Sequence, residues 1–185
     1  MKNINKNKYL TKHVVNVFLA AFVVFSASSV LASSITVENI ELLVNRERRA
    51  RNLQPLAIDS DLSNAAYMKS KDMLNRSYFD HYAFGLTPWN FMINSGYEYI
   101  FAGENLAMDF QTSEGMVKAW MNSPAHRDNI LNPEFRDLGI GIVKGEFKEG
   151  ESARSTVMVT NMFGRQTPSI LKFFESIKNR ILNIL

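Results

Sequence analysis

The sequence predicts a single α+β domain in which helices cover a small antiparallel sheet. Apolar residues recur at helical spacing through the middle of the chain, whereas β-rich segments occupy residues 138–143 and 156–163. The 185 residues suffice for one domain of ordinary size with a tail. Hydrophobic residues make up 46% of the chain, so a buried core can form.

The N-terminal segment has the organisation of an export signal. Residues 1–13 contain four lysines and no acid, nine apolar residues follow from Val17 to Phe25, and a serine-rich stretch ends in Val30-Leu31-Ala32. This order is typical of a secretory signal peptide, so we expect cleavage after Ala32 and a secreted or extracytoplasmic mature protein. The alternative is a membrane anchor formed by an uncleaved N-terminal segment, because residues 14–32 approach the length of a span.

Charge and composition exclude several classes of function. The whole chain has a formal net charge of +3, but without residues 1–32 it has 17 Lys and Arg against 18 Asp and Glu. The basic run Arg46 to Arg51 is interrupted by Glu47 and is typical of a solvated helix face, so we expect no nucleic-acid partner. With 0 Cys, the chain has no disulfide, thiolate metal site or cysteine nucleophile.

Two helices are predicted at the start of the mature chain. The first begins behind the N-cap residue Thr36 and ends near Arg51. Pro55 then interrupts the helical pattern, and Asp59 or Ser60 can cap the second helix. One stripe of this second helix carries small and apolar residues together with one lysine: Leu62, Ala65, Ala66, Lys69 and Met73.

Three further helical segments are marked by their end signals. Thr87-Pro88 is a cap followed by a proline suited to a first helical turn, and Gly96 ends that helix. Another helix is expected from Thr112 or Ser113 to the proline of Ser123-Pro124. The same Ser123-Pro124 pair opens a short helical turn that contains His126.

The pattern changes after Pro133. Segments 138–143 and 156–163 predict two antiparallel strands, joined by a hairpin loop in the charged stretch 144–154. A last amphipathic helix is expected to pack on the domain or on a second copy, or to lie on a membrane surface through residues 169–185. The predicted division is signal peptide 1–32, domain 33–166 and C-terminal amphipathic helix 167–185.

Two histidines and one acid carry the candidate chemistry. His81 follows a predicted helix, His126 lies at a helix start, and Glu104 lies between them in Gly103-Glu104-Asn105. The glycine permits close approach of another segment, and the Asn105 amide can orient the acid. Two imidazoles and one carboxylate are ligand types that bind Zn²⁺ or a similar ion. The commoner role of a single histidine, a satisfied polar residue, stays open from spacing alone.

An ordered set of motifs extends over roughly Ile40 to Gly164. It comprises Leu43-Val44-Asn45-Arg46-Glu47-Arg48, Leu53-Gln54-Pro55-Leu56, Phe79-Asp80-His81, Ala102-Gly103-Glu104-Asn105-Leu106-Ala107, Trp120-Met121-Asn122-Ser123-Pro124-Ala125-His126-Arg127-Asp128-Asn129-Ile130-Leu131, Leu138-Gly139-Ile140-Gly141 and Asn161-Met162-Phe163-Gly164. The set resembles the CAP superfamily (cysteine-rich secretory proteins, antigen 5 and pathogenesis-related 1 proteins), also called SCP-like domains, and above all its short bacterial secreted branch. The resemblance implies an α-β-α sandwich.

The resemblance also implies a cleft. In many members two histidines and two acids in a cleft can bind a divalent metal, and His81, Glu104 and His126 match three of these positions. Ser123 stands where the remaining acid would fall, and we interpret it as a helix cap. The implied ligand-binding cleft is therefore His81, Glu104, His126, Asn105 and Ser123, with His81, His126 and Glu104 as the metal ligands and zinc as the candidate ion.

The function favoured is a non-enzymatic binding module, secreted or envelope-associated, whose cleft binds a divalent metal or a small polar or lipid ligand. Lipid, a cell-envelope glycan and protein are the candidate partners. The first alternative is a metal-dependent hydrolase, acting on proteins or the cell wall, with Glu104 as general base. No serine stands in the Gly-x-Ser-x-Gly setting of an activated nucleophile. The second alternative is a structural or interaction protein whose polar cluster only stabilises the fold.

Overall fold

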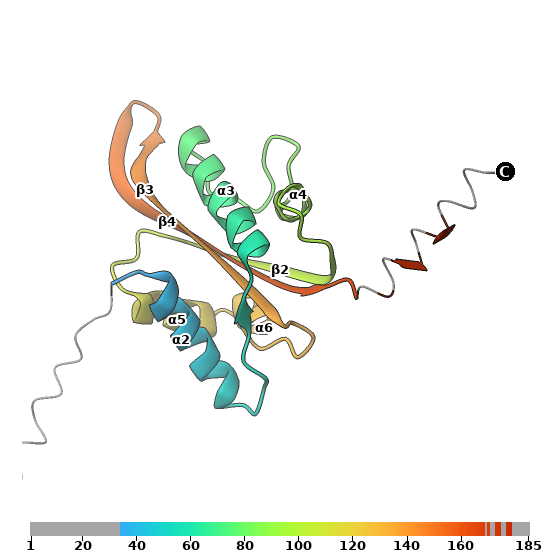
Figure 1. The fold of residues 1–185 in the computed structure, drawn as a ribbon. Helices are drawn as coiled ribbons and strands as arrows, with labels where there is room; N and C mark the ends of the chain where they lie inside the picture. The colour runs from blue at the N-terminus through green and yellow to red at the C-terminus, as the bar shows by residue number, and fades with distance from the viewer. Residues whose placement is uncertain (1–33, 169, 171–172, 175–176, 179–185) are drawn as a thin grey trace, which may run out of the picture. The chain divides into compact units, whose positions relative to one another are not determined.

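A four-stranded sheet lies between two layers of helices in the computed structural model, which describes residues 34–168, 170, 173–174 and 177–178 (Figure 1). The predicted α+β class and the sandwich of helix, sheet and helix are confirmed. One face of the sheet is covered by α3 (Ser60–Arg76) and α4 (Pro88–Asn94), and the other by α2 (Val37–Arg49), α5 (Ser113–Asn122) and α6 (Pro124–Ile130).

The strand order β1-β3-β4-β2 places β2 at one edge of the sheet. The strands are β1 (Ala57–Ile58), β2 (Tyr99–Met108), β3 (Asp137–Glu149) and β4 (Ser152–Gln166). β1 pairs with β3 in parallel, whereas the other neighbours are antiparallel. The sequence predicted only the segments of β3 and β4 and a wholly antiparallel sheet, so the structure adds the long strand β2 and the short parallel strand β1.

The hairpin between β3 and β4 is longer than predicted. The strands pair from Asp137 to Glu149, and only Gly150 and Glu151 form the turn, so the expectation of a loop over 144–154 is wrong. This charged stretch keeps the period-two alternation of a strand, because Phe147 is buried between exposed neighbours. Gly150 has φ +63°, a left-handed conformation that glycine adopts without strain.

The helix starts agree with the cap residues that the sequence indicates. Thr36, Asp59, Thr87 and Thr112 each accept a hydrogen bond from a backbone N–H group in the first turn of their helix. Ser123 occupies the N-cap position of α6, as expected, but its side chain makes no capping hydrogen bond. The local signal for the start of α6 is therefore the proline at its first helical position.

Two glycines of β3 let α3 lie directly on the sheet. A Cβ atom would lie 2.3 Å from the Leu62 backbone at Gly139, and 2.2 Å from the Ala66 backbone at Gly141. Both distances are far shorter than a van der Waals contact, so only glycine permits this approach. Ala65 and Ala66 are fully buried at the contact, in keeping with their place on the predicted stripe.

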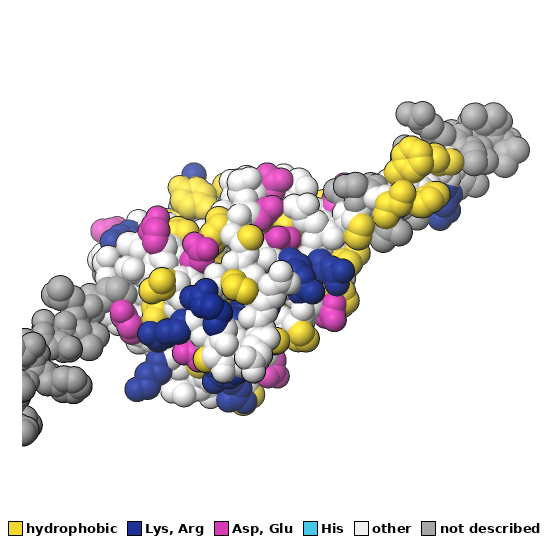
Figure 2. All heavy atoms as spheres, turned by 60° about the horizontal axis from the view of Figure 1, so that its bottom comes forward, with side chains coloured by type: hydrophobic (Ala, Val, Ile, Leu, Met, Phe, Trp, Pro, Cys, Tyr) yellow, Lys and Arg dark blue, Asp and Glu magenta, His cyan; other side chains and the backbone are white. Residues whose placement is uncertain are grey.

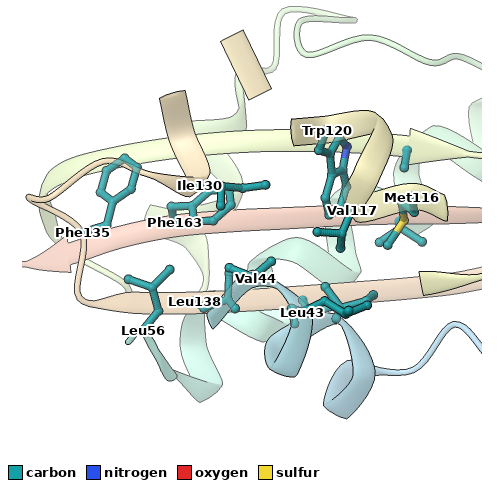
Figure 3. Packing of buried hydrophobic residues seen from close by; sticks show 14 residues of the cluster. Leu43, Val44, Leu56, Met116, Val117, Trp120, Ile130, Phe135, Leu138 and Phe163 are labelled. Carbon is teal, nitrogen blue, oxygen red and sulfur yellow. The ribbon is translucent and has the colours of Figure 1, made fainter. Parts of the chain in front are cut away.

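The opposite face of the sheet carries the main apolar core (Figure 3). Its side chains come from three helices, the sheet and the loops before β1 and β3, and they point into one layer. Alternate residues of β4 contribute to the two faces, because Val159 and Phe163 belong to this core whereas Met158 and Met162 pack under α3 and α4. Residues labelled in Figure 3 include Leu43, Val44, Val117, Trp120 and Ile130.

Arg48 departs from the solvated helix face expected for the run Arg46 to Arg51, because its side chain is fully buried. Its guanidinium donates hydrogen bonds of 2.8 to 2.9 Å to the carbonyl oxygens of Gln54, Ile130 and Asn132. Arg48 thereby ties α2 to the end of α6 and the loop after it. Elsewhere on the face that Figure 2 brings forward, Lys and Arg side chains are interspersed with Asp and Glu.

Two predicted segments fall mostly outside the described residues. The signal peptide, residues 1–32, lies wholly outside them, as does most of the helix expected over 167–185. The described apolar side chains of that last segment are exposed. Within the described ranges, no helix combines the length and the apolar character needed to cross a membrane.

We expect the replacement Gly141→Ala to lower the free energy of unfolding by about 2 kcal/mol or more, because the added methyl group forces α3 away from the sheet. Gly145→Ala on the same strand is the matched control. The atom nearest its new methyl group is the end of the Leu74 side chain, which can rotate, so we expect a loss below about 1 kcal/mol. Urea unfolding of both variants measures the difference, and equal losses would contradict the close contact.

Candidate functional site

A cleft of about 310 Å³ opens at the edge of the sheet, beside β2. Its walls come from the α3–α4 loop, the start of α4, the middle of β2 and α6. The lining residues come from three separate stretches of the sequence, 81–89, 102–104 and residue 129, so the cleft is a product of the fold. Its lining consists of His81, Tyr82, Pro88, Trp89, Ala102, Gly103, Glu104 and Asn129.

His81 and Glu104 form a hydrogen-bonded pair in this cleft. The distance between His81 Nδ1 and Glu104 Oε1 is 2.6 Å. The His81 side chain is 42% exposed and the Glu104 side chain only 2%, so the imidazole faces the cleft and the carboxylate lies beneath it. The pair therefore presents one half-exposed ring whose orientation is set by a buried acid.

The surroundings of Glu104 disfavour its charge. Burial raises the pKa of the Glu104 carboxyl, while the hydrogen bond with His81 and the positive charge of Lys69 lower it. Among the described residues, Glu104 Oε2 has no hydrogen-bond partner although it is fully buried. A carboxylate oxygen that is buried without a hydrogen-bond partner destabilises the charged form of the acid. The environment of Oε2 therefore acts in the same direction as the raised pKa of Glu104.

The pKa values of the two histidines are shifted in opposite directions. The hydrogen bond to Glu104 raises the pKa of His81, against a smaller opposing effect of burial. Burial lowers the pKa of His126, and the charge of a protonated His81 lowers it further. The site can therefore hold one imidazolium, on His81, more easily than two.

The backbone around Glu104 is held by α6. Asn129 Nδ2 donates to the Glu104 carbonyl oxygen at 2.9 Å and to Asn105 Oδ1 at 2.8 Å, and Asn105 Nδ2 donates to the His126 carbonyl oxygen at 2.9 Å. A Cβ atom at Gly103 would lie 2.8 Å from Asn129 Oδ1, so the expectation that this glycine permits close approach is confirmed. The expectation that Asn105 orients Glu104 is wrong, because the Asn105 amide binds α6 instead.

The structure brings only part of the predicted residue set together. His81 and Glu104 are in contact, whereas His126 and Ser123 are not among the residues that line the cleft. His126 lies on α6, and its carbonyl oxygen rather than its ring makes the contact with Asn105. Sequence reasoning missed Tyr82, Trp89 and Asn129 in the lining, since nothing in the local patterns brings their segments to one place.

The described residues do not form a complete metal site in this arrangement. In the described part of the chain, no group of three or more His, Asp or Glu side chains is placed to hold one. The Nδ1 atom of His81 is bonded directly to Glu104 at 2.6 Å, which leaves no space for an ion between these two atoms. The zinc site of His81, His126 and Glu104 stays a prediction.

Comparisons with known proteins find similarity along most of the described domain. The family described as "Cysteine-rich secretory protein family" (CAP) matches residues 42–161. YkwD of Bacillus subtilis (strain 168) is 48% identical over 104 residues, which are 55% of this chain and 40% of that protein. The membrane protein YlbC of the same organism is 30% identical over 101 residues, 54% of this chain and 29% of that protein. The chain thus matches less than half the length of these relatives.

Two solved structures resemble the fold. An extracellular protein containing a SCP domain from Bacillus anthracis str. Ames gives a TM-score of 0.60 at 30% identity, over 70% of this chain and 40% of that chain. An outer surface protein from Borrelia burgdorferi gives a TM-score of 0.58 at 22% identity, over 74% of this chain and 100% of that chain. At the second level of identity the likeness concerns the fold alone.

We expect NMR titration of the imidazole signals to give a higher pKa for His81 than for His126. The replacement Glu104→Gln should lower the pKa of His81, because a neutral amide no longer stabilises the imidazolium. The exposed residue Glu146 supplies the control Glu146→Gln, which should leave both histidines unchanged. An unchanged pKa of His81 in Glu104→Gln would show that the pair does not exist in solution.

The raised pKa of His81 also determines the direction in which the stability of the fold changes with pH. Because the pKa of His81 is higher in the folded than in the unfolded chain, its protonation stabilises the fold below the unfolded value of about 6.5. This contribution is lost as the pH rises through the folded pKa. The opposite holds for His126, whose lowered pKa makes acidification unfavourable to the fold.

Proposed function

Because this chain belongs to the cysteine-rich secretory protein (CAP) family, we propose that it is an extracytoplasmic binding module whose cleft beside β2 holds a small polar ligand. The observation that carries the proposal is the His81–Glu104 pair, a half-exposed imidazole oriented by a buried acid at the floor of a cleft. Two proteins of similar fold, one extracellular and one an outer surface protein, support the location. The predicted signal peptide supports it independently.

The lining favours a ligand with hydroxyl or amide groups over an acyl chain. Among the described residues, no leucine, isoleucine, valine or methionine lines the cleft, and its apolar lining residues are Tyr82, Pro88, Trp89 and Ala102. Flat aromatic faces beside polar groups suit a sugar ring, which has an apolar face and a rim of hydroxyl groups. Of the candidate partners, a cell-envelope glycan is therefore the one we propose.

A hydrolase is a second candidate, with changed roles for the two residues. Glu104 is the general base expected from the sequence, but one of its oxygens is hydrogen-bonded to His81 and the other is fully buried, so neither oxygen is open to a molecule in the cleft. His81 does reach it. A carboxylate bonded to Nδ1 sets the ring so that Nε2 can accept a proton from a water molecule, which makes His81 the base and Glu104 its orienting partner.

We expect oligosaccharides of N-acetylglucosamine to shift backbone amide signals of the cleft residues in ¹H–¹⁵N NMR spectra. His81→Ala should weaken this binding about tenfold, the loss of one hydrogen bond to a charged group. Glu146→Gln is the control, because Glu146 is exposed and is not among the lining residues, and it should change the affinity less than about twofold.

Other outcomes separate the alternatives. Shifts caused by phosphatidylglycerol vesicles but not by the sugar would contradict the glycan ligand. Release of shorter sugars or peptides from peptidoglycan that disappears in His81→Ala would replace the binding module by the hydrolase. No response to any of these probes would favour the structural role.

A further inference from the structure

Lys69 is a fully buried lysine next to the His81–Glu104 pair, and within the described ranges it is the only lysine that is buried. It lies on the face of α3 that packs against the sheet. Its Nζ atom donates to the carbonyl oxygens of Asp80 at 2.8 Å and of His81 at 3.0 Å, and to the Tyr78 hydroxyl at 3.3 Å. The three N–H groups of the ammonium thus meet three acceptors.

Such a residue is an expensive way to fill a core position. Burial lowers the pKa of Lys69, and the carboxylates of Glu104, Asp72 and Asp80 oppose this shift. A methionine of similar length would avoid the loss of hydration. The presence of a lysine here is therefore better explained by the groups that its ammonium holds than by packing.

The backbone groups that the ammonium binds belong to the segment of His81, the member of the pair that lies outside helices and strands. Glu104 is fixed by the pairing of β2 with β4, and α3 is fixed on the glycines of β3. His81 lies instead on the loop between α3 and α4 (Figure 1). The hydrogen bonds from Lys69 to the backbone of Asp80 and His81 connect this loop to α3 at the residue that carries the imidazole.

We propose that Lys69 is the positioning residue of the pair: it holds the backbone of Asp80 and His81 so that the imidazole meets Glu104 at hydrogen-bond distance. The ammonium acts through His81 and contacts no ligand itself. The inference rests on the proposed function only in treating His81 as the residue that faces the ligand. Its test reads the pair directly, so a cleft without a ligand and a lysine without a positioning role are separate results.

The test uses the full chain labelled with ¹⁵N-histidine. A hydrogen bond of 2.6 Å to Glu104 should give the Hδ1 proton of His81 a downfield, slowly exchanging NMR signal. In Lys69→Met this proton should exchange at least ten times faster while the backbone spectrum stays that of a folded protein. Lys71→Met, an exposed position on the same helix, should leave the signal unchanged. A folded Lys69→Met protein that keeps the signal overturns the proposal.

Chemical rescue separates positioning from a general loss of packing. Because the chain has 0 Cys, Lys69→Cys supplies a unique thiol that 2-bromoethylamine converts, in the unfolded chain, to a thioether analogue of lysine. After refolding, this product should regain the Hδ1 signal, whereas the product of iodoacetamide should not. The proposal is overturned if the amine product folds without the signal or if the amide product shows it.

A measurement on the unaltered chain covers the case in which the Lys69 variants do not fold. Three acceptors in a buried place should slow the exchange of the Lys69 ammonium protons at least tenfold relative to exposed lysines. Spectra of ¹⁵N-lysine-labelled protein should therefore show one protected ammonium group. Without such a signal, Lys69 is not held as the proposal requires.

Discussion

The contact between α3 and β3 is the constraint on which the site depends. At Gly139 and Gly141 the helix backbone takes the space that a side chain would fill, so α3 lies closer to the sheet than a helix normally can. The approach brings Ser70 within hydrogen-bond distance of the Gly141 carbonyl oxygen and of Thr160. It also places Lys69 beneath the loop that carries His81. A larger residue at either glycine of β3 would move α3 away from the sheet. The imidazole of His81 would then be separated from Glu104.

The edge position of β2 explains why the cleft opens where it does. An edge strand exposes unpaired backbone groups, and here side chains from α5 and α6 bind two of them. Trp120 Nε1 donates to the Leu106 carbonyl oxygen, and Asn129 Nδ2 to that of Glu104, each at 2.9 Å. These contacts hold the middle of β2 on the side where it has no neighbouring strand. The cleft lies at the end of this covered stretch, where Ala102 and Gly103 join its lining.

Buried polar side chains connect the layers of this cysteine-free domain. The Asn45 amide both donates to and accepts from the backbone of Leu56, at 2.9 and 2.8 Å, and holds the loop after α2. Tyr97 donates to Asp137 at 2.6 Å across the opposite face. Arg48 joins α2 to the end of α6 in the same manner. Fully satisfied contacts of this kind specify one arrangement of loops, the task that disulfides perform in many secreted domains.

Local chemistry in the sequence determined where the helices begin and the family to which the chain belongs. A cap such as Thr36 or Thr87 acts within three residues, so neighbouring letters carry the information. The ordered motifs likewise identified His81 and Glu104 as candidate site residues. The charged half of β3 has the composition of a loop, which is why the sequence predicts a loop there, although its alternation is that of a strand.

Only the tertiary structure decided the rest. Residues 103–107 of β2 are buried on both faces and include Gly, Glu and Asn, so the segment shows neither alternation nor strong β-propensity. Its strand conformation comes from pairing with β4. The sequence placed Lys69 on an apolar stripe but could not show that its ammonium meets the loop of His81. Such partners are brought together by the packing of whole elements, which no spacing along the chain records.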